Sequence, residues 1–257
     1  MIIELFGPPG VGKTTFAKTL AERLRERGHA VELVMSVRPA EQAPPAAPEA
    51  QRASGGRSAA FERLRRPFIE MLRLLGRPSF APHGASSAND LVGMLTPTSR
   101  LWSFRLSQYL TRLSRSWQSA ASASNSIMVF DQAFVQAVSS LMLLGENEDE
   151  TLVSQLLDRA PKADLLIRLD APRDVLEARL TARENAQGLM ERLFELDLAR
   201  NLALIGIIDR LQALLEKRGE TVIRVDSLDR HSHEEGVARV EERLAASSSA
   251  ELLRVAS

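Results

Sequence analysis

The sequence predicts a three-layer α/β fold, in which a five-stranded parallel sheet is covered by helices on both faces. Short apolar runs alternate along the chain with segments whose apolar residues recur at helical spacing, a pattern typical of parallel sheets with helical crossovers. The first apolar run leads through a glycine-rich turn into an amphipathic helix. The chain has 257 residues, which is enough for one such domain.

Each predicted strand is a short apolar run, and each predicted helix is a longer segment with its apolar residues on one side. The first strand ends at Gly7, and the helix after it carries Phe16, Leu20 and Leu24 at helical spacing before Gly28 stops it. The predicted strands are 2–6, 30–35, 127–130, 165–169 and 221–225. The predicted helices are 14–27, 101–118, 133–144, 151–159, 172–184 and 190–217.

Residues 38–100 interrupt this alternation, and we interpret them as an insert within a single domain of residues 1–246. They hold eight of the twelve prolines, and residues 40–58 are rich in alanine, proline and glycine, with little to bury. Residues 61–75 carry an apolar stripe flanked by arginines. Such a basic amphipathic helix either packs on its own domain or makes a weak contact with an anionic membrane surface. Residues 247–257 are expected to be a frayed tail.

The composition excludes several classes of protein. The 33 basic and 33 acidic side chains cancel, so the whole chain has no net electrostatic attraction to nucleic acid or to a membrane. The absence of cysteine excludes disulfides, thiolate metal sites and cysteine nucleophiles. His231 and His233 could hold a metal, but a solvated loop more often explains such a pair. No apolar run could span a membrane and no signal peptide is visible, so we expect a cytoplasmic protein.

The most specific motif is GPPGVGKTT at residues 7–15, a G-x-x-x-x-G-K-[ST] pattern between a strand and a helix. Its glycines allow main-chain N–H groups to turn toward phosphate oxygens, and the helix start adds partial positive charge. Lys13 would reach the β- and γ-phosphates of ATP, and the Thr14 hydroxyl would bind Mg²⁺. A glycine-rich turn without a ligand is the less common alternative, so the sequence predicts a P-loop NTPase fold. The predicted nucleotide-binding residues are Gly7, Pro8, Pro9, Gly10, Val11, Gly12, Lys13, Thr14 and Thr15.

The third apolar run, Ile127 to Phe130, is followed directly by Asp131 and Gln132. A carboxylate at the end of a buried strand in a P-loop protein is a candidate for a second magnesium ligand. It is also the nearest candidate for a base, if the phosphate acceptor is a hydroxyl group. The alternative is that Asp131 caps the helix that begins at Ala133.

Two arginines follow the fourth predicted strand. Arg179 and Arg183 lie four residues apart and so share one helix face. Phosphoryl transfer spreads negative charge over the migrating group, and the P-loop contains no arginine, so the compensating charge must come from elsewhere. We expect Arg179 and Arg183 to close over the transferring phosphate, with Arg192 flanking the same loop. The alternative is a solvated helix face with ordinary surface ion pairs.

Together, the P-loop, Asp131 and the segments 164–183 and 194–226 resemble the thymidylate kinase branch of the P-loop nucleoside-monophosphate kinases. The resemblance covers the first 37 residues and roughly residues 100–246. It implies an ATP site at the P-loop, an arginine-bearing lid after the fourth strand and an adenine pocket near residues 226–228.

The same resemblance implies an acceptor-binding helix with an arginine and a glutamine, to which Arg105 and Gln108 correspond with the spacing shifted by one residue. Elsewhere the acceptor side departs from the family. Thymidylate kinases carry Asp-Arg after the third strand, where this chain has Gln132 after its aspartate. They carry Thr-Arg-Glu-Pro after the second strand, where this chain reads Ser-Val-Arg-Pro, so Arg38 replaces a carboxylate and cannot accept a proton.

The sequence therefore predicts an ATP- and Mg²⁺-dependent phosphotransferase that acts on a small acceptor, either a nucleoside monophosphate or another small metabolite. The Asn-Lys-x-Asp motif of GTPases is absent, and Asp131 after the third predicted strand is followed by Gln132 rather than by the glutamate of many hydrolysing ATPases. The remaining alternative is a regulatory ATPase that acts through a partner or through a membrane contact of the insert. A homodimer is compatible with the sequence. The predicted catalytic residues are Lys13, Asp131, Arg179 and Arg183, the predicted metal ligands are Thr14 and Asp131, and the candidate acceptor-binding residues are Arg38, Arg105, Gln108 and Gln132.

Overall fold

The computed structural model describes residues 1–36, 91–95, 97–123, 126–186 and 196–255, with the side chains described as far as residue 246. By its internal contacts the chain divides into one unit of residues 1–36 and 84–257, and a second unit of residues 37–83. The second unit lies outside the described residues, and so do Arg38, Arg192 and the amphipathic segment 61–75. The described helices and strands all belong to the first unit.

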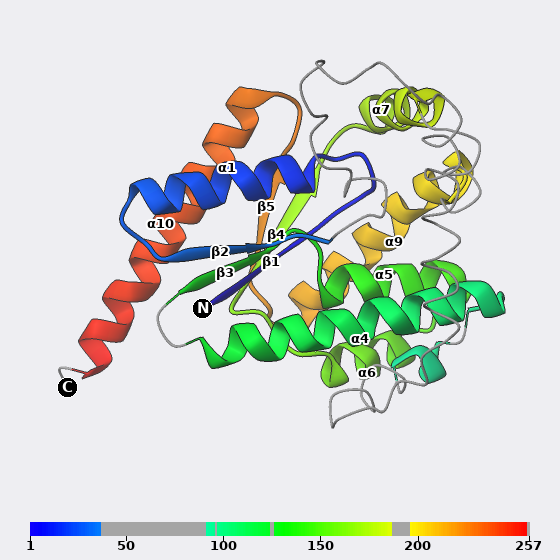
Figure 1. The fold of residues 1–257 in the computed structure, drawn as a ribbon, viewed down its shortest axis with the longest axis horizontal. Helices are drawn as coiled ribbons and strands as arrows, with labels where there is room; N and C mark the ends of the chain where they lie inside the picture. Colours follow the sequence, from blue (N-terminus) through cyan, green and yellow to red (C-terminus); the bar gives the residue numbers. More distant parts are fainter. Residues whose placement is uncertain (37–90, 96, 124–125, 187–195, 256–257) are drawn as a thin grey trace, which may run out of the picture. The chain divides into compact units, whose positions relative to one another are not determined.

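The first unit is built on a five-stranded sheet in the order β2-β3-β1-β4-β5 (Figure 1). All of its neighbouring strands run parallel, which confirms the predicted fold class. The central strand pairs Glu4 with Phe130 on one side and with Leu166 on the other. The strands are β1 (Ile2–Phe6), β2 (Val31–Val34), β3 (Ile127–Phe130), β4 (Leu165–Asp170) and β5 (Val222–Asp226).

Helices cover both faces of this sheet, which completes the three layers (Figure 1). α1 and α10 pack on one face, and α4, α5, α6 and α9 pack on the other. α7 follows β4 and packs against α9. The helices are α1 (Lys13–Glu26), α4 (Arg100–Ser122), α5 (Phe134–Leu144), α6 (Glu150–Arg159), α7 (Arg173–Ala186), α9 (Leu198–Lys217) and α10 (Arg230–Val255).

The central strand is apolar on both sides because both faces of the sheet are buried. In β1, Ile3 and Leu5 belong to the core under α1 and α10, while Ile2 and Phe6 belong to the core under α4, α5 and α9. Glu4 lies between Ile2 and Phe6 on this second side and is only 1 % exposed. A single carboxyl group is therefore enclosed in the core a short distance before the P-loop.

Two boundaries differ from the expected ones. α10 continues to Val255, into the segment 247–257 that was expected to be a tail. The residues at 245–250 are alanines and serines without a glycine or proline to stop the helix. α9 begins at Leu198 rather than 190, because the Asp197 side chain accepts a hydrogen bond from the Arg200 N–H at 2.8 Å and caps the helix there.

The predicted insert ends at residue 100, but some residues before that position already belong to the hydrophobic core. Leu91, Val92 and Leu95 are buried in the same cluster as residues of α4 and α5. The Thr98 N–H also donates a hydrogen bond to the carbonyl oxygen of Leu144 at 3.0 Å, which ties this segment to the end of α5.

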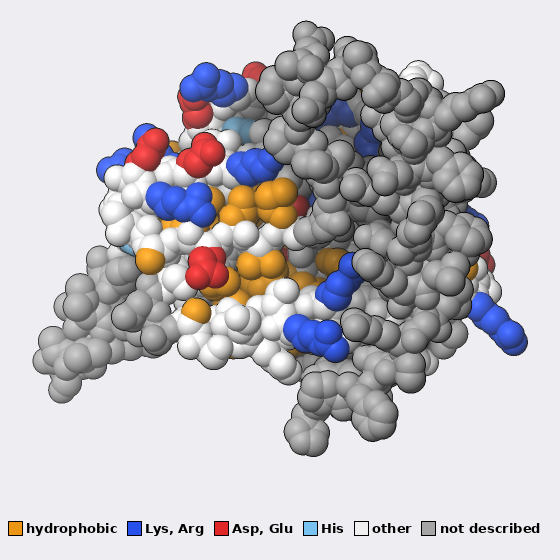
Figure 2. Space-filling model, in the orientation of Figure 1, with side chains coloured by type: hydrophobic (Ala, Val, Ile, Leu, Met, Phe, Trp, Pro, Cys, Tyr) orange, Lys and Arg blue, Asp and Glu red, His pale blue; other side chains and the backbone are white. Residues whose placement is uncertain are grey.

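The described surface in Figure 2 carries acidic and basic side chains interspersed with one another, in line with the balanced composition. Within the described ranges, none of the helices combines the length and the apolar character that crossing a membrane requires.

Candidate active site

The loop of residues 7–12 joins β1 to α1, and two of its glycines are required by space and backbone geometry. A Cβ atom on Gly7 would lie 2.4 Å from the carbonyl oxygen of Leu169, so no side chain fits there. Gly12 has a φ of 95°, in the left-handed region, and is the N-cap of α1. The loop therefore packs closely against β4 and passes directly into the N-terminus of α1, whose free N–H groups are an anion-binding feature.

Lys13 folds back over this loop. Its Nζ donates hydrogen bonds to the carbonyl oxygens of Gly7 at 2.7 Å and Pro8 at 3.0 Å, and the side chain is buried. Hydrogen bonds from an ammonium group to charged oxygens are stronger than those to neutral carbonyls. The geometry therefore allows Lys13 to exchange the loop carbonyls for phosphate oxygens.

Asp131 lies beside the start of α1. Thr14 Oγ1 donates to Asp131 Oδ2 at 2.9 Å, and the Ser36 N–H donates to Asp131 Oδ1 at 2.7 Å. Asp131 is only 1 % exposed. The structure thus brings together the two residues predicted as magnesium ligands and adds Ser36, which follows β2 and which the sequence analysis did not single out. A hydroxyl and a carboxylate at this distance form the hard oxygen donor set that Mg²⁺ prefers.

Asp131 does not cap the following helix, which was the alternative role considered for it. The N-cap of α5 is Ala133, which makes no side-chain cap hydrogen bond. The carboxylate of Glu4 takes this place from β1, because its Oε1 accepts a hydrogen bond from the Val135 N–H at 2.6 Å. Gln136 in the first turn of α5 also accepts a hydrogen bond from the Gly7 N–H at 3.2 Å, so this turn supports the start of the P-loop.

Tyr109 on α4 interacts electrostatically with Glu4 and Asp131. Burial raises the pKa of Tyr109, and the charges of Glu4 and Asp131 raise it further. The hydroxyl is buried and makes no hydrogen bond to any described part of the chain. Tyr109 and Glu4 are functional candidates that sequence reasoning missed. The signal that could have found Glu4 is a charged residue within a fully buried strand.

Glu4 should make the stability of the protein depend on pH. Burial raises its pKa from 4.5 to about 8, so the folded state holds this proton over a range in which the unfolded state has lost it. The free energy of unfolding should then fall by about 1.4 kcal/mol for each pH unit between roughly pH 4.5 and 8. Glu4→Gln keeps an acceptor for the Val135 N–H, so it should remove this slope and be more stable than the wild type at pH 8.

Urea unfolding at pH 5, 6, 7 and 8 would measure this effect. Glu32→Gln, on the exposed side of β2, is the matched control and should leave the slope unchanged. Parallel pH profiles for wild type and Glu4→Gln would contradict the raised pKa.

Arg179 on α7 reaches the segment that follows β5. Its two terminal nitrogens donate to the carbonyl oxygens of Ser227 at 3.0 Å and Leu228 at 2.8 Å. The neighbouring Leu180 is buried. A Cβ atom on Gly10 would lie only 3.3 Å from Cγ of Leu180. α7 therefore packs on the P-loop, and Arg179 bridges from α7 to the region expected to form the adenine pocket. Arg183 lies one turn further along α7 and is half-buried.

Ser227 and His233 also contact the P-loop. The Ser227 hydroxyl donates to the carbonyl oxygen of Val11 at 2.5 Å and lies 2.6 Å from Nε2 of His233. The interpretation of His231 and His233 as a solvated loop is corrected, since both belong to α10 and His233 packs its ring against Phe16 at 5.5 Å. His231 is exposed, and the described residues contain no cluster of three or more side chains suited to a metal.

No protein-family model and no curated protein matches the sequence. Solved structures do match it. A structure of deoxyadenosine kinase from M. mycoides with bound dATP is 14 % identical, covers 95 % of this chain and 99 % of its own, and has a TM-score of 0.50. This chain shares the fold of that structure, an α/β fold with a five-stranded parallel sheet between helices. Another structure of that enzyme, with the products dCMP and a flexible dCDP bound, is 15 % identical over 96 % of this chain and 100 % of its own, with a TM-score of 0.48.

Three of the candidate acceptor-binding residues, Arg105, Gln108 and Gln132, lie within the described part of the chain. Arg105 on α4 lies over the ring of Trp102, with 4.7 Å between the guanidinium carbon and the ring centroid. Gln108 lies one turn later and is half-buried, and Gln132 follows Asp131 at the end of β3 and is half-exposed. Their roles toward an acceptor stay predictions, as does that of Arg38, which lies outside the described residues.

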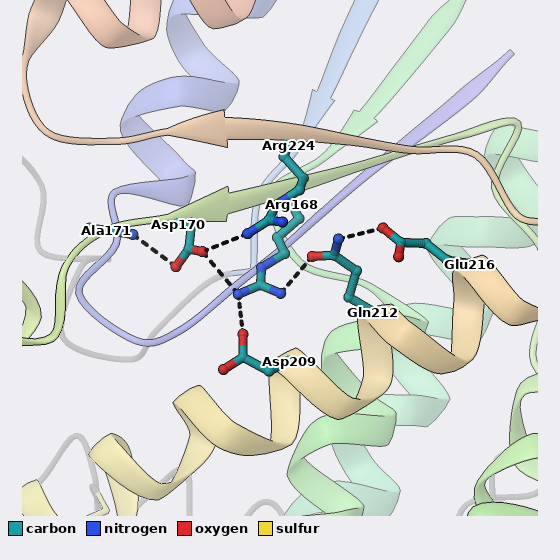
Figure 3. Close-up of polar contacts among 7 residues, drawn as sticks. All are labelled: Arg168, Asp170, Ala171, Asp209, Gln212, Glu216 and Arg224. Atoms are coloured by element: carbon teal, nitrogen blue, oxygen red, sulfur yellow. Dashed lines mark hydrogen bonds and ion pairs between the residues drawn. The ribbon is translucent and has the colours of Figure 1, made fainter.

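A second polar cluster lies between the sheet and α9 (Figure 3). Arg168 of β4 is only 3 % exposed and donates hydrogen bonds to Gln212 at 2.5 Å, to Asp170 at 3.0 Å and to Asp209. Arg224 of β5 contacts the same Asp170 carboxylate at 3.5 Å. A buried guanidinium is tolerated only when it is paired, so these partners hold the end of β4 in place beside the P-loop.

Removing this buried charge should be costly. Arg168→Met leaves the carboxylates around it without their central partner, and we expect a loss of about 3 kcal/mol in the free energy of unfolding. Arg224→Met, which removes a side chain that is 61 % exposed, is the control and should cost about 0.5 kcal/mol or less. Urea unfolding of both variants checks the difference, and equal losses would contradict a special role for Arg168.

Proposed function

We propose that the protein is an ATP- and Mg²⁺-dependent phosphotransferase that moves the γ-phosphate of ATP to a small acceptor. The observation that carries this proposal is the hydrogen bond between Thr14 and Asp131 beside the loop that Lys13 crosses. A glycine-rich loop alone could be a turn, but a buried carboxylate paired with the hydroxyl next to the loop lysine is the arrangement that magnesium-bound phosphates require.

Each residue would have a definite part. The loop N–H groups and Lys13 would hold the β- and γ-phosphates, and Thr14 and Asp131 would hold Mg²⁺. When bound, Mg²⁺ would neutralise charge on the phosphate oxygens. Arg179 and Arg183 on α7 would add positive charge as the lid closes. Catalysis would then come mainly from positioning and charge stabilisation.

For the acceptor, we propose a neutral hydroxyl compound such as a nucleoside, ahead of dTMP or another monophosphate. Among the described residues, the Asp131 carboxylate accepts hydrogen bonds from the hydroxyl of Thr14 and from the N–H and hydroxyl of Ser36, and the amide of Gln132 comes next in the chain. An uncharged amide suits a neutral acceptor better than a phosphate dianion, which favours arginine. The name of the matched enzyme, deoxyadenosine kinase, supports the same acceptor class. Asp131 would be the nearest base toward the hydroxyl proton.

An acceptor panel tests this proposal. ADP release from Mg·ATP should rise at least tenfold with a nucleoside or deoxynucleoside and stay near the basal rate with the corresponding monophosphates. Stimulation by dTMP instead would favour the thymidylate kinase-like assignment and overturn the neutral-acceptor proposal. Stimulation by neither group, with ATP still bound, would favour the regulatory ATPase. The cytoplasmic location and a homodimer stay predictions.

A further inference from the structure

Ser227, which follows β5, connects three parts of the nucleotide site through its own polar atoms. Its hydroxyl donates to the carbonyl oxygen of Val11 in the P-loop at 2.5 Å. Its N–H donates to the carbonyl oxygen of Asp170 at the end of β4 at 2.8 Å. Its carbonyl oxygen accepts from Arg179 of α7 at 3.0 Å. Ser227 is 1 % exposed, so no solvent competes for these contacts.

The direction of the hydrogen bond from His233 follows from counting donors. A serine hydroxyl has one proton, and a carbonyl oxygen can only accept, so the Ser227 proton is committed to Val11. Nε2 of His233, 2.6 Å from the same hydroxyl oxygen, must therefore be the donor. Burial lowers the pKa of His233 and the Arg179 charge lowers it further, so the neutral ring carries its proton on Nε2.

This chain of hydrogen bonds fixes the orientation of one P-loop peptide. In a trans peptide, the C=O and the N–H point in opposite directions. Because the Val11 carbonyl points at Ser227, the Gly12 N–H points away from Ser227. Gly12 cannot hold this orientation by its own preference, since glycine populates positive and negative φ values about equally.

We propose that Ser227 and His233 are positioning residues of the nucleotide site, which orient the Val11–Gly12 peptide so that its N–H faces the phosphates of ATP. The inference rests on the proposed function, because it requires phosphates to bind in the P-loop. A Cβ on Gly12 would lie only 3.1 Å from Ser227 Oγ, which shows how closely the serine supports the loop from outside.

Isothermal titration of the full chain with Mg·ATP, and separately with inorganic tripolyphosphate, tests the inference. Ser227→Ala should weaken both ligands about tenfold, because an oriented donor to a charged group is lost. His233→Leu should weaken both several-fold, whereas His233→Gln, which keeps an N–H donor, should stay within about twofold of the wild type. His231→Leu, at the exposed histidine two residues away, is the matched control and should bind like the wild type.

Thermal unfolding of each variant separates a folding defect from a binding defect. If Ser227→Ala fails to fold, the comparison of His233→Gln with His233→Leu still tests the proposal. Wild-type affinity in His233→Leu, or equal weakening by both His233 substitutions, would overturn the proposal. A wild-type protein that binds neither ligand would overturn the proposed function itself, which is a different and recognisable result.

Discussion

Lys13→Ala is expected to lower kcat for phosphoryl transfer by about a thousandfold, the largest effect of any single substitution considered. The Lys13 ammonium is buried and donates hydrogen bonds to the loop carbonyls of Gly7 and Pro8 at 2.7 and 3.0 Å. It can therefore exchange these carbonyls for phosphate oxygens without leaving the loop. Its loss would remove a full positive charge from the place where transition-state charge accumulates.

Lys18→Ala is the matched control, because Lys18 lies on the exposed side of the same helix. It should leave kcat unchanged, and circular dichroism should show both variants folded. A Lys13→Ala protein that keeps more than a tenth of the wild-type kcat would contradict the role given to this residue.

Asp131→Asn is expected to lower kcat/KM by about a hundredfold and to raise the Mg²⁺ concentration needed for half-maximal activity. The substitution keeps the size of the side chain and one oxygen that can accept from the Ser36 N–H. It removes the negative charge that a divalent cation requires. Initial rates across a magnesium titration at saturating ATP would separate weaker metal binding from slower transfer.

Ser36→Ala is the control for this variant. It removes a hydroxyl at 3.4 Å from Asp131 but leaves the main-chain N–H at 2.7 Å in place. Its magnesium requirement should match that of the wild type within about twofold. An unchanged magnesium requirement in Asp131→Asn would show that Asp131 is not a metal ligand.

The sequence allowed the fold and one half of the site to be predicted, because both depend on local patterns. The glycines, Lys13 and Thr14 lie within eight residues of one another, and Asp131 was recognisable at the end of a buried strand. The parallel sheet could be expected from the strand and helix alternation, whereas its order, β2-β3-β1-β4-β5, does not follow from that pattern.

The other half depends on contacts between residues far apart in the chain, which no local pattern records. Ser36 and Asp131 are 95 residues apart, and Ser227 and Val11 are 216 apart. Glu4 lies within an apolar strand and becomes a cap only because α5 begins above it. His233 looked like part of a solvated loop because its burial depends on how α10 packs on α1. Arg179 was expected over the phosphates, and its contacts with Ser227 and Leu228 add a role that spacing alone could not indicate.

The most direct test of the central claim follows the γ-phosphate itself. Wild-type protein would be incubated with Mg·ATP labelled in the γ-phosphate and with a deoxynucleoside, and labelled product and inorganic phosphate would be separated and counted. The proposed function predicts one labelled deoxynucleoside monophosphate for each ADP formed, with transfer by Lys13→Ala about a thousandfold slower. Label found only in inorganic phosphate, at a rate that no acceptor on the panel changes, would contradict a phosphotransferase and identify the protein as an ATPase.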